Sequence, residues 1–216
     1  MIDCILEVKL ESPALIGSGE GYGAIIDSDV VFDDLGLPYI PARRVKGCLR
    51  EAATDNAAVF GPVAPVTAAV DACFGVPGQE ASAPLVVESL CLADAGDLRR
   101  WLGWCAAVKP DLVNRSSVLG QFCEIRRRTA IDAETGTAQA HTLRSARLVR
   151  KGHVFRGRLR LDEAHLDLVV LAAWGWRGLG TSRTRGFGEI SCRLLDVNGK
   201  ELRAETMKRM EAVCAK

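Results

Sequence analysis

The sequence lacks the features that would assign several protein classes at once. No apolar run in its 216 residues reaches the roughly 18–20 residues that a membrane-spanning helix needs, so no membrane partner is expected. The first residues lack the basic-then-apolar pattern of a secretion signal, and the eight cysteines never form a CxxC pair. These absences predict a cytoplasmic protein with reduced thiols, and they disfavour a zinc site.

A net charge of +1 shows that the chain is not strongly basic overall, but it conceals segregated charges. Residues 1–40 hold eight acids and one base, residues 126–160 hold ten bases and two acids, and residues 43–50 hold four bases. Such separation indicates a polyanion bound on one face, or self-association between acidic and basic ends. Two solvated faces of opposite sign are the simpler interpretation.

Hydrophobic residues make up 48% of the chain, which is enough for a substantial core, and their spacing predicts an α+β fold. The expected strands cover residues 2–10, 85–87, 154–161 and 190–197, and the expected helices cover residues 43–53, 97–108, 163–176 and 202–213. Strands and helices mixed in this way are typical of a ferredoxin-like or RNA-recognition-motif sheet.

Two segments do not fit this core. Residues 54–83 are rich in proline and glycine and predict an irregular insertion. Residues 126–150 are polar and basic around the turn residues 134–136, which predicts a hairpin that projects from the sheet. Trp101 and Trp104 follow an apolar helical stripe, so we expect them in the core rather than on a base-stacking surface.

A glycine-rich loop at residues 178–188 lies between an expected helix and an expected strand. Glycine tolerates positive φ and close approach to a ligand, and Arg183 and Arg185 would suit an anion such as a phosphate backbone. The order helix, loop, strand disfavours a dinucleotide-binding fingerprint, which needs strand, loop, helix. An ordinary glycine-rich turn is the alternative.

Four motifs in this order resemble the RAMP superfamily (repeat-associated mysterious proteins). They are an amino-terminal signature at residues 15–27 and 37–50, a Cys-Phe-Gly element at 73–75, a thumb hairpin at 128–138 and a carboxy-terminal glycine-rich loop at 178–188. The resemblance covers nearly the whole chain and implies a single RAMP domain, residues 1–216, with a modified RNA-recognition-motif core. Its expected parts are a core of residues 1–53, 84–125 and 152–197, an insertion at 54–83, a thumb hairpin at 126–151 and a carboxy-terminal helix at 202–213.

The resemblance also implies a mechanism. In the backbone subunits of type III CRISPR complexes, copies stack along a guide RNA, and each thumb wedges between guide and target and displaces one base. Catalytic members cleave the target beside that base with a first-loop aspartate and a divalent metal. The matching residue is Asp27, the expected catalytic residue and ligand of Mg²⁺ or Mn²⁺. Asp29 is a rival, since Ser28 and Asp29 stand where Asn-Pro or a similar pair is common. The simpler interpretation of Asp29, Asp33 and Asp34 is that they are solvated loop acids.

A set of basic, glycine and threonine residues is expected to contact RNA. These residues are Arg43, Arg44, Lys46 and Arg50 in the first helix, Arg126, Arg127, Arg128, Thr135 and Gly136 in the hairpin, and Gly180, Arg183, Arg185 and Gly186 in the glycine-rich loop. The cations would contact phosphates. Ile131 and Leu143 are candidate wedges, because a wedge between bases needs an apolar or flat side chain.

Three hypotheses of function follow. The leading one is a guide-RNA-binding backbone subunit of a type III CRISPR ribonucleoprotein, an endoribonuclease of complementary target RNA in antiviral defence. Its partners would be guide RNA, target RNA and other copies or paralogous subunits. The second is a non-catalytic RNA-binding scaffold of the same kind of complex. The third, a guide-processing nuclease using His141, His153 or His165, is disfavoured because no histidine lies in the first loop.

Overall fold

The computed structural model describes most of the chain, namely residues 1–19, 21, 25–59, 66–76, 78 and 83–214. An antiparallel sheet forms its centre, in the strand order β2-β4-β7-β1-β8, with β3 also paired to β7. The strands are β1 (Ile2–Leu10), β2 (Tyr39–Ile40), β3 (Val86–Val87), β4 (Leu90–Leu92), β7 (Val154–Leu161) and β8 (Ile190–Leu195). The sheet confirms the expected α+β fold, and β1 and β7 have the expected bounds.

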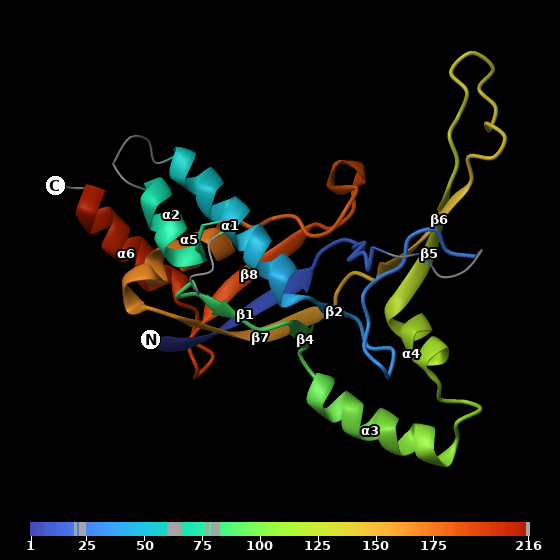
Figure 1. Cartoon of the computed structure of the whole chain (residues 1–216), viewed down its shortest axis with the longest axis horizontal. Coiled ribbons are helices and arrows are strands. Elements are labelled where there is room, and N and C mark those ends of the chain that lie inside the picture. Colours follow the sequence, from blue (N-terminus) through green and yellow to red (C-terminus); the bar gives the residue numbers. More distant parts are fainter. Residues whose placement is uncertain (20, 22–24, 60–65, 77, 79–82, 215–216) are drawn as a thin grey trace.

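Alternation along β1 decides which face of the sheet is buried. Leu6, Val8 and Leu10 are fully buried, and they join one core with residues of the helices α1 and α5. These helices pack against each other, and α5 also packs against β8 (Figure 1). The helices beside the sheet are α1 (Ala42–Val59), α2 (Val66–Phe74), α5 (Leu166–Gly175) with the 3-10 turn η1 (Glu163–His165) before it, and α6 (Arg203–Cys214).

The opposite face of the sheet explains much of the charge segregation. Glu7 lies between Arg156 of β7 and Arg193 of β8, and its carboxylate contacts both guanidinium groups at 2.6 Å. Burial alone would raise the pKa of Glu7, but the hydrogen bonds from the two arginines outweigh burial and lower it. Because β1 pairs with β7, acids of the first segment and bases of the later one neutralise each other within the chain, contrary to the expectation of two separate charged faces.

The expected irregular insertion at 54–83 is partly wrong. Helix α1 continues to Val59, well beyond the expected end at residue 53, and α2 covers residues 66–74. Residues 60–65, 77 and 79–82 of the expected insertion lie outside the described residues. The sequence prediction also missed β2, β4 and the helix α4 (Arg115–Phe122). That helix is only eight residues long, and its start is fixed by a capping box in which Asn114 accepts a hydrogen bond from Ser117 N.

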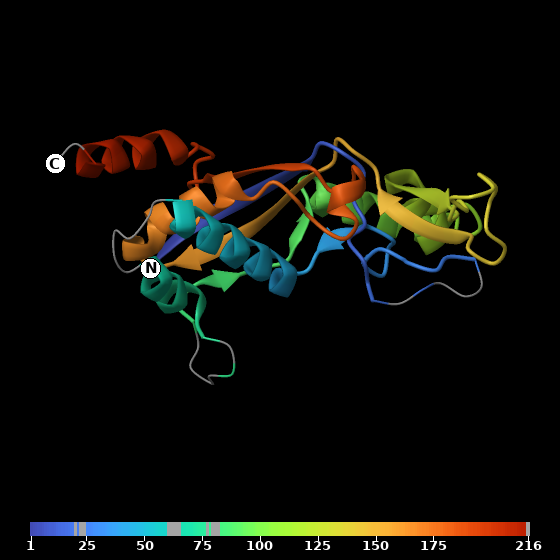
Figure 2. The same cartoon turned by 90° about the horizontal axis from the view of Figure 1, so that it is seen from above.

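The expected projecting hairpin is confirmed. Strands β5 (Cys123–Arg128) and β6 (Arg144–Val149) form a separate two-stranded sheet, and the segment between them extends away from the core (Figure 1). Figures 1 and 2 place this hairpin and α6 at opposite ends of the molecule. Leu148 and Val149, at the base of the hairpin, are buried in the core, so the hairpin is anchored at its base only.

The expected burial of the tryptophan pair is wrong. Helix α3 (Ala95–Val108) has nearly the predicted bounds, but Trp101 is 66% exposed and Trp104 is 61% exposed. Leu98 and Leu102, on the other side of the helix, make its contacts with the core. Periodicity found the helix but did not identify which of its two apolar sides faces inward.

In the described part of the chain no helix has both the length and the apolar character to cross a membrane. Seven of the eight cysteines lie where the structure describes their side chains, and these seven are free thiols.

Candidate functional site

Asp27 lies at the foot of the projecting hairpin, in the segment 25–31, which we call the first loop. Its backbone N–H donates to the carbonyl of Ser145 in β6 at 3.0 Å. Ser145 N donates back to Asp27 Oδ2 at 2.7 Å, and the Ser145 hydroxyl lies 3.0 Å from the same oxygen and 2.5 Å from the carbonyl of Ile25. The hairpin strand therefore holds one carboxylate oxygen of Asp27 in place.

The second oxygen of Asp27 is more open. Among the described residues Oδ1 accepts no hydrogen bond, Arg144 Nη1 is 3.9 Å away, and the side chain is 45% exposed. Hydrogen bonds from Ser145 hold the pKa of Asp27 below its ordinary value, and the bond from the Ser145 backbone N–H contributes more than the bond from its hydroxyl. Asp27 is therefore ionised at neutral pH, so it can bind a cation or accept a proton but has no proton to donate.

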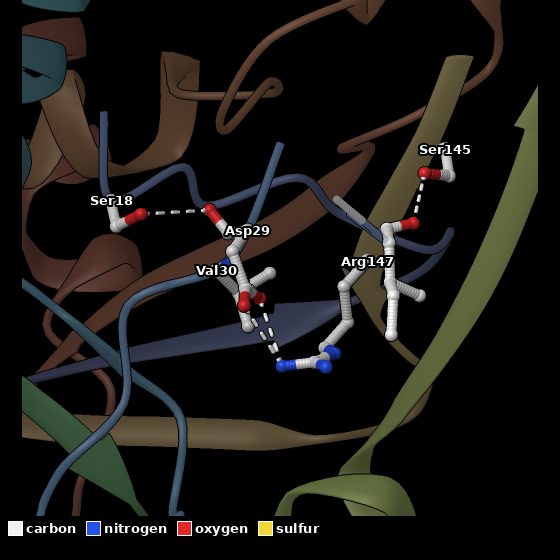
Figure 3. A network of polar contacts seen from close by, with 6 residues as sticks. Ser18, Asp29, Val30, Ser145 and Arg147 are labelled. Atoms are coloured by element: carbon white, nitrogen blue, oxygen red, sulfur yellow. Dashed lines mark hydrogen bonds and ion pairs between the residues drawn. The ribbon is translucent and has the colours of Figure 1, made fainter. Parts of the chain in front are cut away.

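Asp29 has a different environment. It is 5% exposed, and both carboxylate oxygens contact Arg147 Nη1, at 3.1 and 2.9 Å (Figure 3). Its Oδ1 also accepts a hydrogen bond from Val30 N at 2.7 Å, while its carbonyl accepts one from Ser18 N at 2.8 Å. Asp29 is thus a buried ion-pair residue that joins the loop to β6, and this geometry does not favour it as the rival catalytic group.

The neighbouring acids differ from one another as well. We expected Asp33 and Asp34 to be solvated loop acids, like Asp29. Asp33 instead accepts hydrogen bonds from Leu35 N and Leu37 N and pairs with Arg99, so it is structural. Only Asp34 is exposed as expected.

Three of the four basic residues in α1 are committed to contacts within the chain. Lys46 and Arg50 share a helix face, as predicted from their spacing. The contacts are Arg44 Nη2 to Gly17 O at 2.8 Å, Lys46 Nζ to Leu85 O at 3.2 Å, and Arg50 to Gly75 O and Asp71 Oδ1, each at 2.7 Å. Arg43 is exposed. The basic cluster therefore holds loops around the helix, and Arg43 is the member that projects to solvent.

The hairpin carries its basic residues at the base and a tight turn at its tip. Arg126 pairs with Glu124 at 2.6 Å, Arg128 stacks on the Phe187 ring at 5.4 Å, and Arg127 is exposed. The expected tip at Thr135 and Gly136 is confirmed. Asp132 Oδ1 accepts hydrogen bonds from the Thr135 N–H and hydroxyl, Asp132 O accepts one from Gly136 N, and Gly136 has φ of 67°. The candidate wedges Ile131 and Leu143 are 61% and 60% exposed.

The glycine-rich loop uses two of its glycines for packing within the protein. A Cβ on Gly180 would lie 2.3 Å from Leu15 O, and a Cβ on Gly188 would lie 1.9 Å from Leu179 O. Gly180 has φ of 85° and Gly188 has φ of 74°. The close approach that we expected toward a ligand is thus made, at these positions, toward the protein's own backbone.

The outer part of the same loop is open to solvent. The 3-10 turn η2 (Arg183–Arg185) carries both arginines, of which Arg183 lies 3.4 Å from Glu51 and Arg185 is exposed. Gly186 has φ of 78° and open space around its Cα. Anion binding here stays a prediction, and Arg185 and Gly186 are the residues positioned for it.

The histidines lie on three separate elements. His141 is on the exposed hairpin, His165 is in η1, and His153 lies before β7 against the Phe122 ring. Burial lowers the pKa of His153. Among the described residues, no three or more His, Cys, Asp or Glu side chains come together as potential ligands of one metal ion.

Sequence reasoning missed the residues that set the two loop carboxylates apart. Ser145 and Arg147 contact Asp27 and Asp29 across a separation of 118 residues in each case. No local spacing rule connects positions so distant. The only available signal was the combination of a basic hairpin and an acidic first segment.

The family model of the RAMP superfamily matches residues 7–191 of this chain. No curated protein matches it. Among solved structures, a chain of the type III-B Cmr-beta complex bound to cognate target RNA superposes with a TM-score of 0.67 and 13% identity, covering 90% of this chain and 97% of that one. A chain of the same kind of complex in its apo state gives a TM-score of 0.67 and 14% identity over 89% and 97%. At these identities the likeness concerns the fold.

Proposed function

This chain belongs to the RAMP superfamily, and we propose that it is a guide-RNA-binding backbone subunit of a type III CRISPR ribonucleoprotein. In this proposal the assembly cleaves complementary target RNA with a divalent metal at Asp27, in antiviral defence. The fold is shared with chains of type III-B assemblies, one of which is bound to cognate target RNA. The proposed partners are guide RNA, target RNA, and other copies or paralogous subunits.

The observation that carries the proposal is the position of the Asp27 carboxylate beside the base of the projecting hairpin. The side chain is half-exposed, ionised and held by Ser145 of β6. A hairpin that inserts between two RNA strands would bring a backbone phosphate close to its own base, where Asp27 lies. Ile131 and Leu143, exposed farther along the hairpin, are the proposed wedges.

The oxygen donors fit a magnesium or manganese ion held mainly by RNA and water. Mg²⁺ commonly keeps several waters and takes one or two carboxylates together with phosphate oxygens. Asp27 Oδ1 can supply one such carboxylate oxygen, whereas Asp29 is committed to Arg147. A bound ion would stabilise negative charge at the scissile phosphate. The role of this chain is to hold the Asp27 carboxylate in a fixed orientation through Ser145.

The exposed cations are proposed as phosphate contacts. Three arginine side chains make no hydrogen bond or ion pair within the described ranges, and each belongs to a different element. They are Arg43 of α1, Arg127 of β5 and Arg185 of η2. Arg44, Lys46 and Arg50 support RNA binding indirectly by fixing the segments around α1. Phosphate contacts of this kind weaken steeply as salt concentration rises.

A non-catalytic scaffold is the second candidate, and the contacts of Asp27 favour it. Asp27 Oδ2 accepts a hydrogen bond from Ser145 N, which is also what a purely loop-stabilising aspartate would do. As far as the structure describes the chain, no second and third metal-ligating side chain joins Asp27. In that case the assembly would bind target RNA without cutting it.

Cleavage of target RNA by the guide-loaded assembly tests the proposal. Wild type, Asp27→Ala and Asp34→Ala are compared with Mg²⁺ and with EDTA, and Asp34 is the matched control because it is an exposed acid nearby in sequence. We expect Asp27→Ala to keep guide binding and to lose cleavage by about 100-fold or more, the scale of removing one charge-stabilising group from a catalytic site. Asp34→Ala should cut like wild type, and EDTA should stop cutting.

Two results would change the conclusion. If Asp27→Ala still cuts at the wild-type rate, Asp27 is not the catalytic residue. If the wild-type assembly binds target tightly but does not cut it with Mg²⁺ or Mn²⁺, the chain is a scaffold.

A further inference from the structure

Two arginines face each other at the outer end of the paired strands of the hairpin. Arg128 is the last residue of β5, Arg144 is the first residue of β6, and the register places them directly opposite one another. Side chains alternate between the faces of a strand, so Arg126 lies on the same face as Arg128. Like charges that stand directly opposite destabilise a strand pair, and this end of the hairpin therefore concentrates positive charge that lowers its own stability.

Most of this charge is not compensated by acids of the chain. Arg126 pairs with Glu124 at 2.6 Å. Among the described residues Arg128 has no ion-pair partner, and its Nη1 is buried without a hydrogen bond. The guanidinium carbon of Arg128 lies 5.4 Å from the centroid of the Phe187 ring, which holds this side chain against the glycine-rich loop. Arg128 is therefore a fixed positive charge opposite Arg144.

Arg144 is the exposed member of the pair, and its side chain is 68% exposed. Within the part of the chain that the structure describes, its polar contacts are long. Nη1 lies 3.4 Å from the carbonyl oxygen of Leu143 and 3.9 Å from Asp27 Oδ1, and the second distance is too long for a hydrogen bond. Arg144 thus lies beside the open oxygen of Asp27 without being bound to it, and its other N–H groups can donate to an acceptor from outside the chain.

We infer that Arg144 binds the one phosphate of the target RNA that lies beside Asp27. The inference deepens the proposed function and rests on it, because it takes the target strand as the ligand of this site. A guanidinium group stays charged at neutral pH, and its planar set of N–H donors matches two oxygens of a phosphate. Close to Asp27 Oδ1, Arg144 would orient the phosphate toward the carboxylate and stabilise negative charge that develops on it during cleavage.

A role in stabilising Asp27 alone does not account for this arrangement. Ser145 already holds the other carboxylate oxygen of Asp27 with a hydrogen bond of 2.7 Å, whereas Arg144 stays beyond that range. The single carboxylate of Asp27 cannot neutralise both Arg144 and Arg128, so the pair of arginines keeps a positive charge. A bound phosphate would remove the repulsion between them, which is why the site favours an anion from outside the chain.

Target RNAs that each carry one uncharged methylphosphonate, at every phosphate in turn, test the inference. The guide-loaded assembly is prepared with wild type, Arg144→Gln and Arg100→Gln, and the targets are shortened until their dissociation constants are measurable. Arg100 is the matched control, because it is an arginine with an 82% exposed side chain on α3. We expect wild type to lose about tenfold in affinity when the phosphate at the cleavage position is neutral, the scale of one hydrogen bond to a charged group. Arg144→Gln should show no loss at that position, and Arg100→Gln should behave like wild type.

Two further measurements separate this contact from a loss of structure. The isolated Arg144→Gln chain should keep its melting temperature, because the side chain is exposed. Arg144→Lys, which keeps the charge but not the planar donors, should retain part of the loss at the cleavage position. With saturating target, single-turnover cleavage by Arg144→Gln should fall by about 100-fold, the scale of removing one donor that stabilises charge at a reacting centre.

The inference is wrong if Arg144→Gln loses affinity at the same phosphates as wild type, or if the position that it no longer senses is not the one that wild type cuts. A wild-type assembly that binds target but never cuts it contradicts the proposed cleavage at Asp27 instead. In that case the binding series still decides the contact. A loss at one phosphate that disappears in Arg144→Gln supports it, and the absence of such a position overturns it.

Discussion

The first loop places two carboxylates in opposite environments, although a single residue separates Asp27 from Asp29. Asp29 is 5% exposed and its charge is compensated by Arg147, whereas the Asp27 side chain is 45% exposed and keeps one oxygen open. The same strand supplies both partners, because Ser145 and Arg147 stand two residues apart on β6. Asp29 therefore joins the loop to β6, whereas the open oxygen of Asp27 is accessible to a ligand.

The largest expected effect breaks the ion pair that joins the loop to β6. Asp29→Ala removes the carboxylate that compensates the guanidinium charge of Arg147, whose side chain is 16% exposed. Removing one partner of a buried ion pair destabilises a protein by about 3–5 kcal/mol. We expect a loss of this size in the free energy of unfolding, measured by urea denaturation of the isolated chain.

The double variant Asp29→Ala with Arg147→Met controls for the cause of that loss. If the uncompensated charge is responsible, the double variant should be more stable than the Asp29→Ala single variant, because contacting residues are not additive. Equal instability of the two variants would mean that the loss comes from the loop backbone, for example from the bond between Val30 N and Asp29.

The sequence predicted the elements better than it predicted their surroundings. Period-two alternation located β1 and β7 to the residue, because one face of each strand is buried and the pattern is strong. Short elements such as β2, β4 and α4 were missed, since two to eight residues carry too little periodicity. The tryptophans of α3 were assigned to the wrong environment because α3 has apolar residues on two sides.

The candidate site was predicted only in part for a related reason. The motif resemblance pointed to Asp27, but the distinction between Asp27 and Asp29 depends on β6, which lies 118 residues away in sequence. The glycine-rich loop at 178–188 was predicted to use positive φ and a close approach, and Gly180 and Gly188 have both. Whether their space is filled by a ligand or by the chain's own backbone is a tertiary property that the sequence does not carry.

A smaller effect is expected at Ser145, which holds Asp27. Ser145→Ala removes the hydroxyl that lies 3.0 Å from Asp27 Oδ2 but keeps the backbone bond to the same oxygen. One side-chain hydrogen bond contributes about 1 kcal/mol, so stability should fall by roughly that amount. Target cleavage should fall as well, because Asp27 is held less firmly. Unchanged cleavage with lowered stability would show that the orientation of Asp27 is not limiting.

The smallest effect is a pH dependence that belongs to Asp27. Hydrogen bonds from Ser145 lower the pKa of Asp27 in the folded state. A carboxyl group of this kind stabilises the fold above its ordinary pKa of about 3.9, and the contribution is lost as pH falls through the lower, folded-state pKa.

Asn keeps an oxygen acceptor but has no charge. The difference in melting temperature between wild type and Asp27→Asn should therefore be constant between about pH 5 and pH 8 and shrink below about pH 4. A difference for Asp27→Asn that grows in acid would contradict the assigned hydrogen bonds.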